Sequence, residues 1–126
     1  MSTPTPLLTA IGQIAINVKD LARARDFYRD VLGIPFLFEA PPGLAFFQCG
    51  SVMLMLGIAE SPEFDHPAST LYFDVADIQN VWTTLKGRGV HCRDEPHVIH
   101  RTPEKTLWMA FFDDSEGNVM ALREWR

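Results

Sequence analysis

The chain repeats one short pattern, and this repeat restricts the fold more than any other feature. Val18-Lys19-Asp20-Leu21 corresponds to Val75-Ala76-Asp77-Ile78, and the two aspartates lie 57 residues apart in a chain of 126. In each copy an alternating apolar stretch precedes the aspartate and a helical apolar stripe follows it. Because the same elements recur in the same order, we predict two tandem copies of one structural unit.

The first copy is predicted to form a strand, a helix and three further strands. Residues 13–18 carry apolar side chains at every second position, which is typical of a strand with one covered face. Asp20 is a candidate N-cap for a helix that Gly33 ends. Three apolar runs separated by turn-forming residues follow, at 34–39, 44–49 and 52–56.

The second copy repeats this order. A strand is predicted at 70–75, and Asp77 is the candidate N-cap of a helix that ends at Gly87 or Gly89. The later strands are expected at about 92–100, 106–112 and 118–125.

These elements predict an α+β fold with two tandem βαβββ modules. We expect the first module at about 10–58, a polar linker at 59–67 and the second module at about 68–125. A chain of this length can bury one apolar core, so a single domain over 1–126 is expected.

The two faces of each predicted sheet differ in composition. One face is apolar and must cover the helix. The other face mixes amide, thioether, aromatic and a few charged groups, on Gln13, Asn17, Met53, Met55, Thr70, Tyr72, Asp74, Ala121 and Arg123. This mixture is unlike a packed core and unlike a plain solvated face, so we predict that these residues line a ligand cleft.

Two questions about this face stay open at the level of sequence. Asp74 and Arg123 either bind a polar group of the ligand or pair with each other. The strands at 44–49 and 106–112 are apolar on both faces, so the pattern does not tell which of their aromatic side chains line the cleft and which belong to the core.

The charge and composition disfavour several classes of partner. The net charge of −5 disfavours nucleic acid, because phosphate contacts need clustered lysine and arginine. No segment approaches the roughly 20 apolar residues of a membrane helix, so no membrane association is expected. Residues 1–8 lack the features of a signal peptide, and Cys49 and Cys92 share no metal-type spacing, which together favour a cytoplasmic location.

Two motifs resemble those of the vicinal oxygen chelate proteins, the glyoxalase, bleomycin-resistance and dioxygenase superfamily. Residues 13–33 resemble the opening signature, through Val-x-Asp-Leu and Asp-Phe-Tyr-x-x-Val-Leu-Gly. Phe111–Asn118 is similar to the closing turn F-x-D-P-[DE]-G-N. The resemblance covers about Ala10 to Glu124 and implies curved mixed sheets that form a cup. It also implies a homodimer, with clefts within or between chains.

The resemblance further implies where metal ligands lie in metal-dependent relatives, which use His, Gln or Glu at four positions. In this chain these positions are Gln13, Met55, Thr70 and Ala121. Only Gln13 is of a ligand type, and hard or borderline ions prefer imidazole and carboxylate groups. We therefore predict no metal ligand of the family type and no cofactor, which puts metal-dependent activities in doubt.

The four histidines have different expected roles. His97 is a candidate catalytic residue, as a general base or hydrogen-bond donor, although a partly exposed strand histidine is the alternative. His100 lies three residues later on the same predicted strand, so the two are expected to face opposite sides. His66 and His91 are expected in surface loops.

Three functions follow from this sequence. The first is a small-molecule-binding protein that sequesters an organic or drug-like ligand in an aromatic and methionine-lined cup. The second is a lyase, isomerase or dioxygenase-type enzyme acting on a small carbonyl or conjugated metabolite through His97, Glu39 or Gln13. The third is a dimeric module with a regulatory role.

Overall fold

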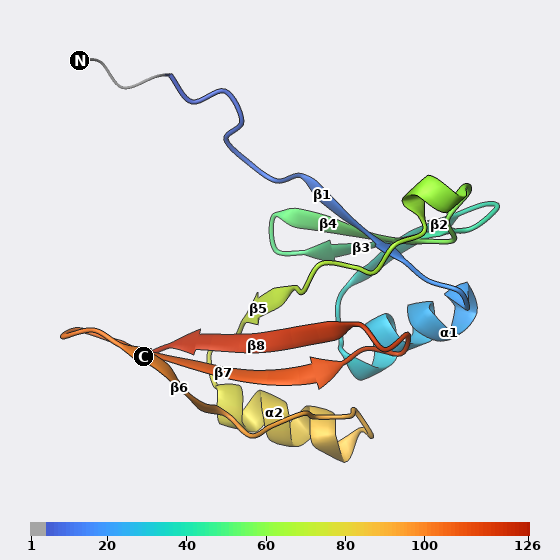
Figure 1. The fold of residues 1–126 in the computed structure, drawn as a ribbon. Helices are drawn as coiled ribbons and strands as arrows, with labels where there is room; N and C mark the ends of the chain where they lie inside the picture. Colours follow the sequence, from blue (N-terminus) through green and yellow to red (C-terminus); the bar gives the residue numbers. More distant parts are fainter. Residues whose placement is uncertain (1–4) are drawn as a thin grey trace.

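The structure is a computed structural model that describes residues 5–126, without the side chain of Phe64. It contains two four-stranded mixed sheets (Figure 1). The strands of the first sheet are, in spatial order, β1 (Gln13–Asn17), β4 (Val52–Gly57), β3 (Leu44–Cys49) and β2 (Phe36–Ala40). Those of the second are β5 (Tyr72–Asp74), β8 (Val119–Trp125), β7 (Thr106–Asp113) and β6 (His97–Arg101).

The two sheets have the same topology, which confirms the predicted fold of two tandem βαβββ modules. In each sheet the first strand of the module pairs in parallel with the last, and the other pairs are antiparallel. The first strands, β1 and β5, are therefore edge strands, and the described residues add no further strand beside them.

Each module carries one main helix, and both predicted N-caps are confirmed. Asp20 accepts a hydrogen bond from the backbone N of Arg23 at 3.1 Å and begins α1 (Leu21–Asp26). Asp77 does the same for α2 (Ile78–Gly87), with the backbone N of Asn80 at 3.1 Å. A short 3₁₀ helix, η2 (Pro62–Phe64), lies in the predicted linker.

The first helix changes geometry before it ends. After α1 the chain continues as one π-helical segment, η1 (Phe27–Val31), in which the backbone N of Leu32 donates to the carbonyl of Phe27 at 2.9 Å. Gly33 then adopts a positive φ of 72°, a conformation that other residues rarely adopt, and the chain turns toward β2.

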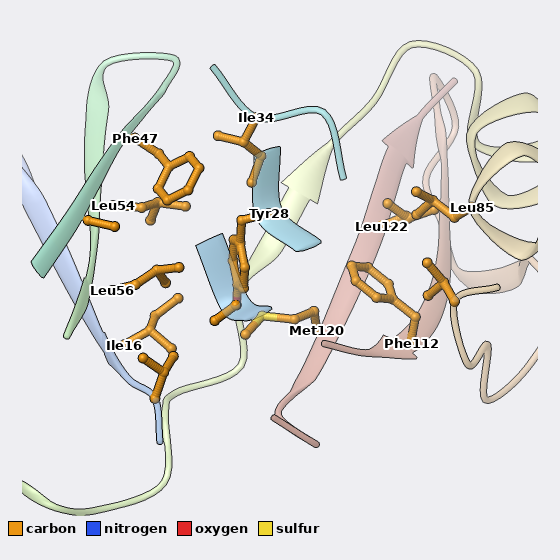
Figure 2. Close-up of a cluster of buried hydrophobic side chains, with 14 of the residues drawn as sticks. Ile16, Tyr28, Ile34, Phe47, Leu54, Leu56, Leu85, Phe112, Met120 and Leu122 are labelled. Carbon is orange, nitrogen blue, oxygen red and sulfur yellow. The ribbon is translucent and has the colours of Figure 1, made fainter. Parts of the chain in front are cut away.

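A single core joins the two modules. Figure 2 shows side chains of the first sheet, such as Leu54, on one side of Tyr28, and Met120 of the second sheet on its other side. The Tyr28 hydroxyl donates to the Asp114 carboxylate at 2.7 Å, and both residues are buried. Burial, followed by the charge of Asp114, raises the pKa of Tyr28.

Two strands of the second module are shorter than predicted. Strand β5 leaves out Thr70, and the region predicted as a strand from 92 begins only at His97, after a single bridge between Cys92 and Phe112. The Asp94 carboxylate accepts the backbone N–H of Phe111 at 2.7 Å, in place of a strand carbonyl. The side chain of Asp94 therefore accepts a hydrogen bond that a backbone carbonyl of the neighbouring strand accepts elsewhere in the sheet.

No helix among residues 5–126 is long and apolar enough to cross a membrane.

Candidate functional site

The candidate site consists of the two sheet faces that lie opposite the core. Along each strand successive side chains alternate between faces, and the members directed to the core, such as Ile16 and Leu122, are buried. The opposite faces are termed the first open face, on β1 to β4, and the second open face, on β5 to β8. Because core side chains occupy the inner faces, the open faces lie on the outer sides of the two sheets.

The first open face brings together four of the predicted ligand-binding residues. Gln13 lies opposite Met53 in the β1–β4 ladder, and its amide donates to the sulfur of Met55 at 3.7 Å. Both methionines are half-buried. The Asn17 amide donates to the carbonyl of His66 at 3.2 Å, so this residue also contacts the linker.

Aromatic rings extend the first open face toward β2. Phe46 lies opposite Met55, and its ring stacks on that of Phe38 with a centroid distance of 4.7 Å and an interplanar angle of 24°. A cavity of about 300 Å³ lies at one end of this face, between the ends of β1 and β4 and the segment that follows β4. Its lining includes Asn17 and Met55. Phe46, not Phe47, is therefore the aromatic side chain of β3 on this face, because Phe47 is fully buried in the core.

The second open face contains a pair of rings beside a salt bridge. The Tyr72 and Phe111 rings make an edge contact with a centroid distance of 6.1 Å. Arg123 lies opposite Asp74, two residues further along the β5–β8 ladder. Its guanidinium binds both carboxylate oxygens of Asp74, Nε to Oδ1 at 2.6 Å and Nη2 to Oδ2 at 3.1 Å. Asp74 and Arg123 therefore pair with each other, which is one of the two alternatives that the sequence left open. The Arg123 hydrogen bonds lower the pKa of Asp74, and the same bonds raise that of Arg123.

Two of the predicted ligand-binding residues differ from the others in their surroundings. Ala121 lies between Tyr72 and Phe111 in the ladder and is fully buried, so these two rings cover its methyl group. Thr70 is exposed but precedes β5, so the ladder does not hold it in the sheet. Its hydroxyl does not share the rigid placement of Gln13 at the matching position of the first module.

A β-bulge corrects the expectation for the two strand histidines. In the β6–β7 ladder His97 lies opposite Met109 and His100 opposite Leu107, and Ile99 is the extra residue. Met109 and Leu107 are two residues apart and share one face, so the bulge places both histidines on the second open face. Simple alternation would have separated them.

The candidate catalytic residue has one ring nitrogen engaged. The Nδ1 atom of His97 lies 2.8 Å from the carbonyl of Glu95, which accepts its hydrogen when Nδ1 is protonated. In that tautomer Nε2 carries the lone pair and can accept a proton. His97 is exposed, and the carboxylate of Asp94 lies 3.7 Å from Nδ1.

The structure also joins His91, which was expected in a surface loop, to the charged side chains of Asp113 and Arg93. One carboxylate oxygen of Asp113 lies 2.7 Å from Nδ1 of His91, and the other accepts from Nε of Arg93 at 2.7 Å. His91 and Arg93 flank Cys92, a half-buried residue packed against the core. The alternation of polar, apolar and polar residues from 91 to 93 was the available signal for a short extended segment.

The four residues at the predicted metal-ligand positions offer few donor atoms. They offer one amide, one thioether, one hydroxyl and one methyl group, and Gln13 already donates to Met55. Among residues 5–126, no group of three or more His, Cys, Asp or Glu side chains is placed to hold a metal ion. The residues present therefore do not fit a hard or borderline divalent ion at these positions.

Comparisons with known proteins agree with the fold and the motifs. The family model of the Glyoxalase/Bleomycin resistance protein/Dioxygenase superfamily matches residues 10–122. No curated protein matches the chain. Solved structures do match, among them a lactoylglutathione lyase from Agrobacterium tumefaciens, with 25% identity, a TM-score of 0.69, and coverage of 94% of this chain and 95% of that chain.

Two further structures have the same fold at lower identity. A superfamily member from Sphaerobacter thermophilus DSM 20745 has 23% identity and a TM-score of 0.76, with coverage of 93% of this chain and 98% of that chain. A protein of the same description from Alicyclobacillus acidocaldarius has 17% identity and a TM-score of 0.71, with 92% and 91% covered.

Proposed function

The chain belongs to the Glyoxalase/Bleomycin resistance protein/Dioxygenase superfamily, and on this premise we propose that it binds a small organic molecule on its open sheet faces. The observation that carries this proposal is the composition of those faces. Methionine and aromatic side chains lie beside a few polar groups, on rigid strands whose other side is anchored in the core. Thioethers and rings adapt to an organic ligand, and the amides of Gln13 and Gln48 can orient it.

We further propose that two copies of the chain form the complete cup. The open faces lie on the outer sides of the two sheets, so a ligand on one of them is covered only if another surface closes over it. Exposed rings such as Phe38 and Tyr72, each 49% exposed, favour such a covering partner. The edge strands β1 and β5 have free outer edges within the described chain, and a homodimer would place the first open face of one copy against the second open face of the other.

The proposal includes a lost metal site. The Met55 thioether cannot replace the carboxylates and imidazoles that hard ions need, Ala121 has no donor group, and Gln13 alone cannot hold such an ion. We therefore propose binding without a family-type metal centre. Elemental analysis of protein purified without chelator tests this point directly. Stoichiometric nickel, zinc, manganese or iron would contradict it.

A thermal-shift screen of small organic compounds tests the binding proposal. We expect some compounds to raise the melting temperature of the unaltered protein but not that of Met55→Lys, because a charge replaces the thioether on the first open face. Lys105→Met is the control, since Lys105 is exposed in the loop between β6 and β7. Light scattering on the same samples should give twice the mass of one chain. Hits that are unaffected by Met55→Lys, or a monomer that binds them equally well, would contradict the proposal.

A second candidate function is an enzyme of the lyase, isomerase or dioxygenase type that acts on a small carbonyl or conjugated metabolite. It is favoured by the engaged Nδ1 of His97, which leaves Nε2 as a proton acceptor, and by the 25% identity to a lactoylglutathione lyase. Turnover of such a compound that falls about 100-fold or more in His97→Gln would favour the enzyme. An equal loss in His66→Gln would indicate that His97 has no special role.

A further inference from the structure

We propose that the second open face holds the carboxylate of a small aromatic ligand at Arg93 and His91, with the ring of that ligand on Tyr72 and Phe111. This inference deepens the proposed function and rests on it, because it names the ligand class for one of the two faces. It adds a polar anchor, here termed the 91–93 anchor, which consists of His91, Arg93 and Asp113.

The backbone places the anchor on the second open face. The backbone N of Arg93 donates to the carbonyl of Phe111 at 2.8 Å, and that of Asp113 donates to the carbonyl of His91 at 3.0 Å. Cys92 and Phe112 form an antiparallel bridge between these two bonds. Residues opposite each other in such a ladder share a face, so His91 lies with Asp113 and Arg93 lies with Phe111.

The Asp113 carboxylate holds an imidazole ring and a guanidinium group next to each other. Its two oxygens contact Nδ1 of His91 and Nε of Arg93, each at 2.7 Å, and only 17% of its side chain is exposed. Burial alone would disfavour the ionised form. The hydrogen bonds from Arg93 and His91 outweigh burial and lower the pKa of Asp113, so the carboxylate stays charged and fixes both partners.

The outer edges of both partners are open to a ligand. The Arg93 side chain is 48% exposed and that of His91 is 74% exposed. Within residues 5–126, neither the two Nη atoms of Arg93 nor Nε2 of His91 takes part in a hydrogen bond. Two adjacent guanidinium N–H groups match the spacing of carboxylate oxygens, and His91 adds a donor when its ring is protonated.

The neighbouring rings decide which carboxylates fit. Phe111 lies opposite Arg93, and the Tyr72 ring meets the Phe111 ring edge-on at 6.1 Å. A ligand whose carboxylate binds the Arg93 guanidinium therefore extends over aromatic surface, which favours a flat apolar body. Arg123, the other arginine on this face, already uses Nε and Nη2 on Asp74, so it offers less to an anion than Arg93 does.

Titration with benzoate, followed by NMR of the His91 ring and the Arg93 side-chain N–H signals, tests this inference. We expect saturable shifts in the full-length protein, no shifts with benzamide, and weaker shifts with phosphate. Arg93→Gln should weaken benzoate binding by about tenfold or more, since it removes the charged half of the contact. Arg101→Gln is the matched control, because this exposed arginine lies outside the anchor, and it should bind benzoate like the unaltered protein.

Several outcomes would overturn the inference. Equal benzoate binding in Arg93→Gln would place the anion elsewhere, and phosphate binding as strong as benzoate binding would remove the role of the rings. Thermal melts of Arg93→Gln show whether the variant is folded. Tyr72→Ala, which leaves the anchor intact, gives a second test, because it should weaken benzoate but not phosphate.

The same samples separate this inference from the proposed function. If the dimer forms and other compounds bind in a Met55-dependent way while benzoate does not bind, only the inference fails. If benzoate binding depends on Arg93 but the protein is a monomer without Met55-dependent ligands, the anchor stands and the proposed cup fails.

Discussion

The hydroxyl of Tyr28 donates to the carboxylate of Asp114 at 2.7 Å and thereby links the helical segment of the first module to the closing turn of the second. Asp114 also accepts the backbone N–H groups of Glu116 and Asn118, each at 2.8 Å. The Glu116 side chain in turn accepts the backbone N–H of Lys19 at 2.8 Å. The turn that resembles the family signature therefore has a physical role, because it fastens one module to the other.

Tyr28→Phe tests the importance of this link. The substitution keeps the ring in the core and removes the hydrogen bond to a buried carboxylate, so we expect a loss of about 1.5–3 kcal/mol in the free energy of unfolding. Urea denaturation measures it. Tyr72→Phe is the control, because Tyr72 is half exposed and its hydroxyl makes no hydrogen bond within the described chain; it should change stability by less than about 0.5 kcal/mol. Equal losses in both variants would contradict the role assigned to Tyr28.

The two N-caps provide a test of the repeat. Asp20→Ala and Asp77→Ala each remove a side-chain acceptor from the first turn of a helix, and each should cost about 1 kcal/mol. Asp20→Asn and Asp77→Asn keep an acceptor and should retain most of the stability. Chemical denaturation of the four variants measures both pairs. If Asp77→Ala leaves the free energy of unfolding unchanged, then the second aspartate is not the structural equivalent of the first.

The salt bridge on the second open face has a pH dependence with a defined sign. Arg123 lowers the pKa of Asp74, so the bridge stabilises the folded chain above the ordinary aspartate value of 3.8. That stabilisation is lost as the pH falls from 3.8 through the lower pKa of the folded state. Because Asp74 is exposed, we expect less than about 1 kcal/mol at pH 7. NMR titration of the Asp74 carboxyl should give a midpoint below 3.8 that moves up in Arg123→Gln, and an unchanged midpoint would refute the assignment.

The burial of Ala121 predicts that a carboxylate is not tolerated at this position. Ala121→Glu places a charge without a partner in a fully buried position, so we expect a loss of about 3–5 kcal/mol or failure to fold. Val119→Glu is the matched control, since Val119 lies two residues earlier on the same strand and the same face but is only half-buried. Val119→Glu should lower the free energy of unfolding far less than Ala121→Glu does. If Ala121→Glu is as stable as Val119→Glu, then the position has more room than its burial indicates.

Residue patterns predicted the repeated part of the fold because that part depends on local physics. Alternation on β1 and the capping aspartates Asp20 and Asp77 act within a few residues of the chain, so they are visible without the partner strands. The same patterns separated core from open face correctly for residues such as Ile16 and Met55. They failed where a side chain replaces a backbone partner, as Asp94 does for Phe111.

The candidate site was predictable only in part, for related reasons. Alternation places every second residue of a strand on one face. The bulge at Ile99 inserts one extra residue, so His97 and His100 lie on the same face although they are three residues apart. The pairing of His91 with Asp113 joins segments 22 residues apart, and the sequence contains no signal for that contact. Nor does it show that Tyr72 and Phe111 enclose Ala121.

Local patterns along the chain predicted the duplicated βαβββ modules and the family, and the four metal-ligand positions that the family resemblance implies stay a prediction. Periodicity, capping and turn chemistry are local, so they are readable along the chain. Which side chains of the open faces are exposed could not be predicted in this way. Exposure, ladder register and salt bridges such as Asp74–Arg123 depend on contacts between distant segments, and these contacts form only when both modules pack on one core.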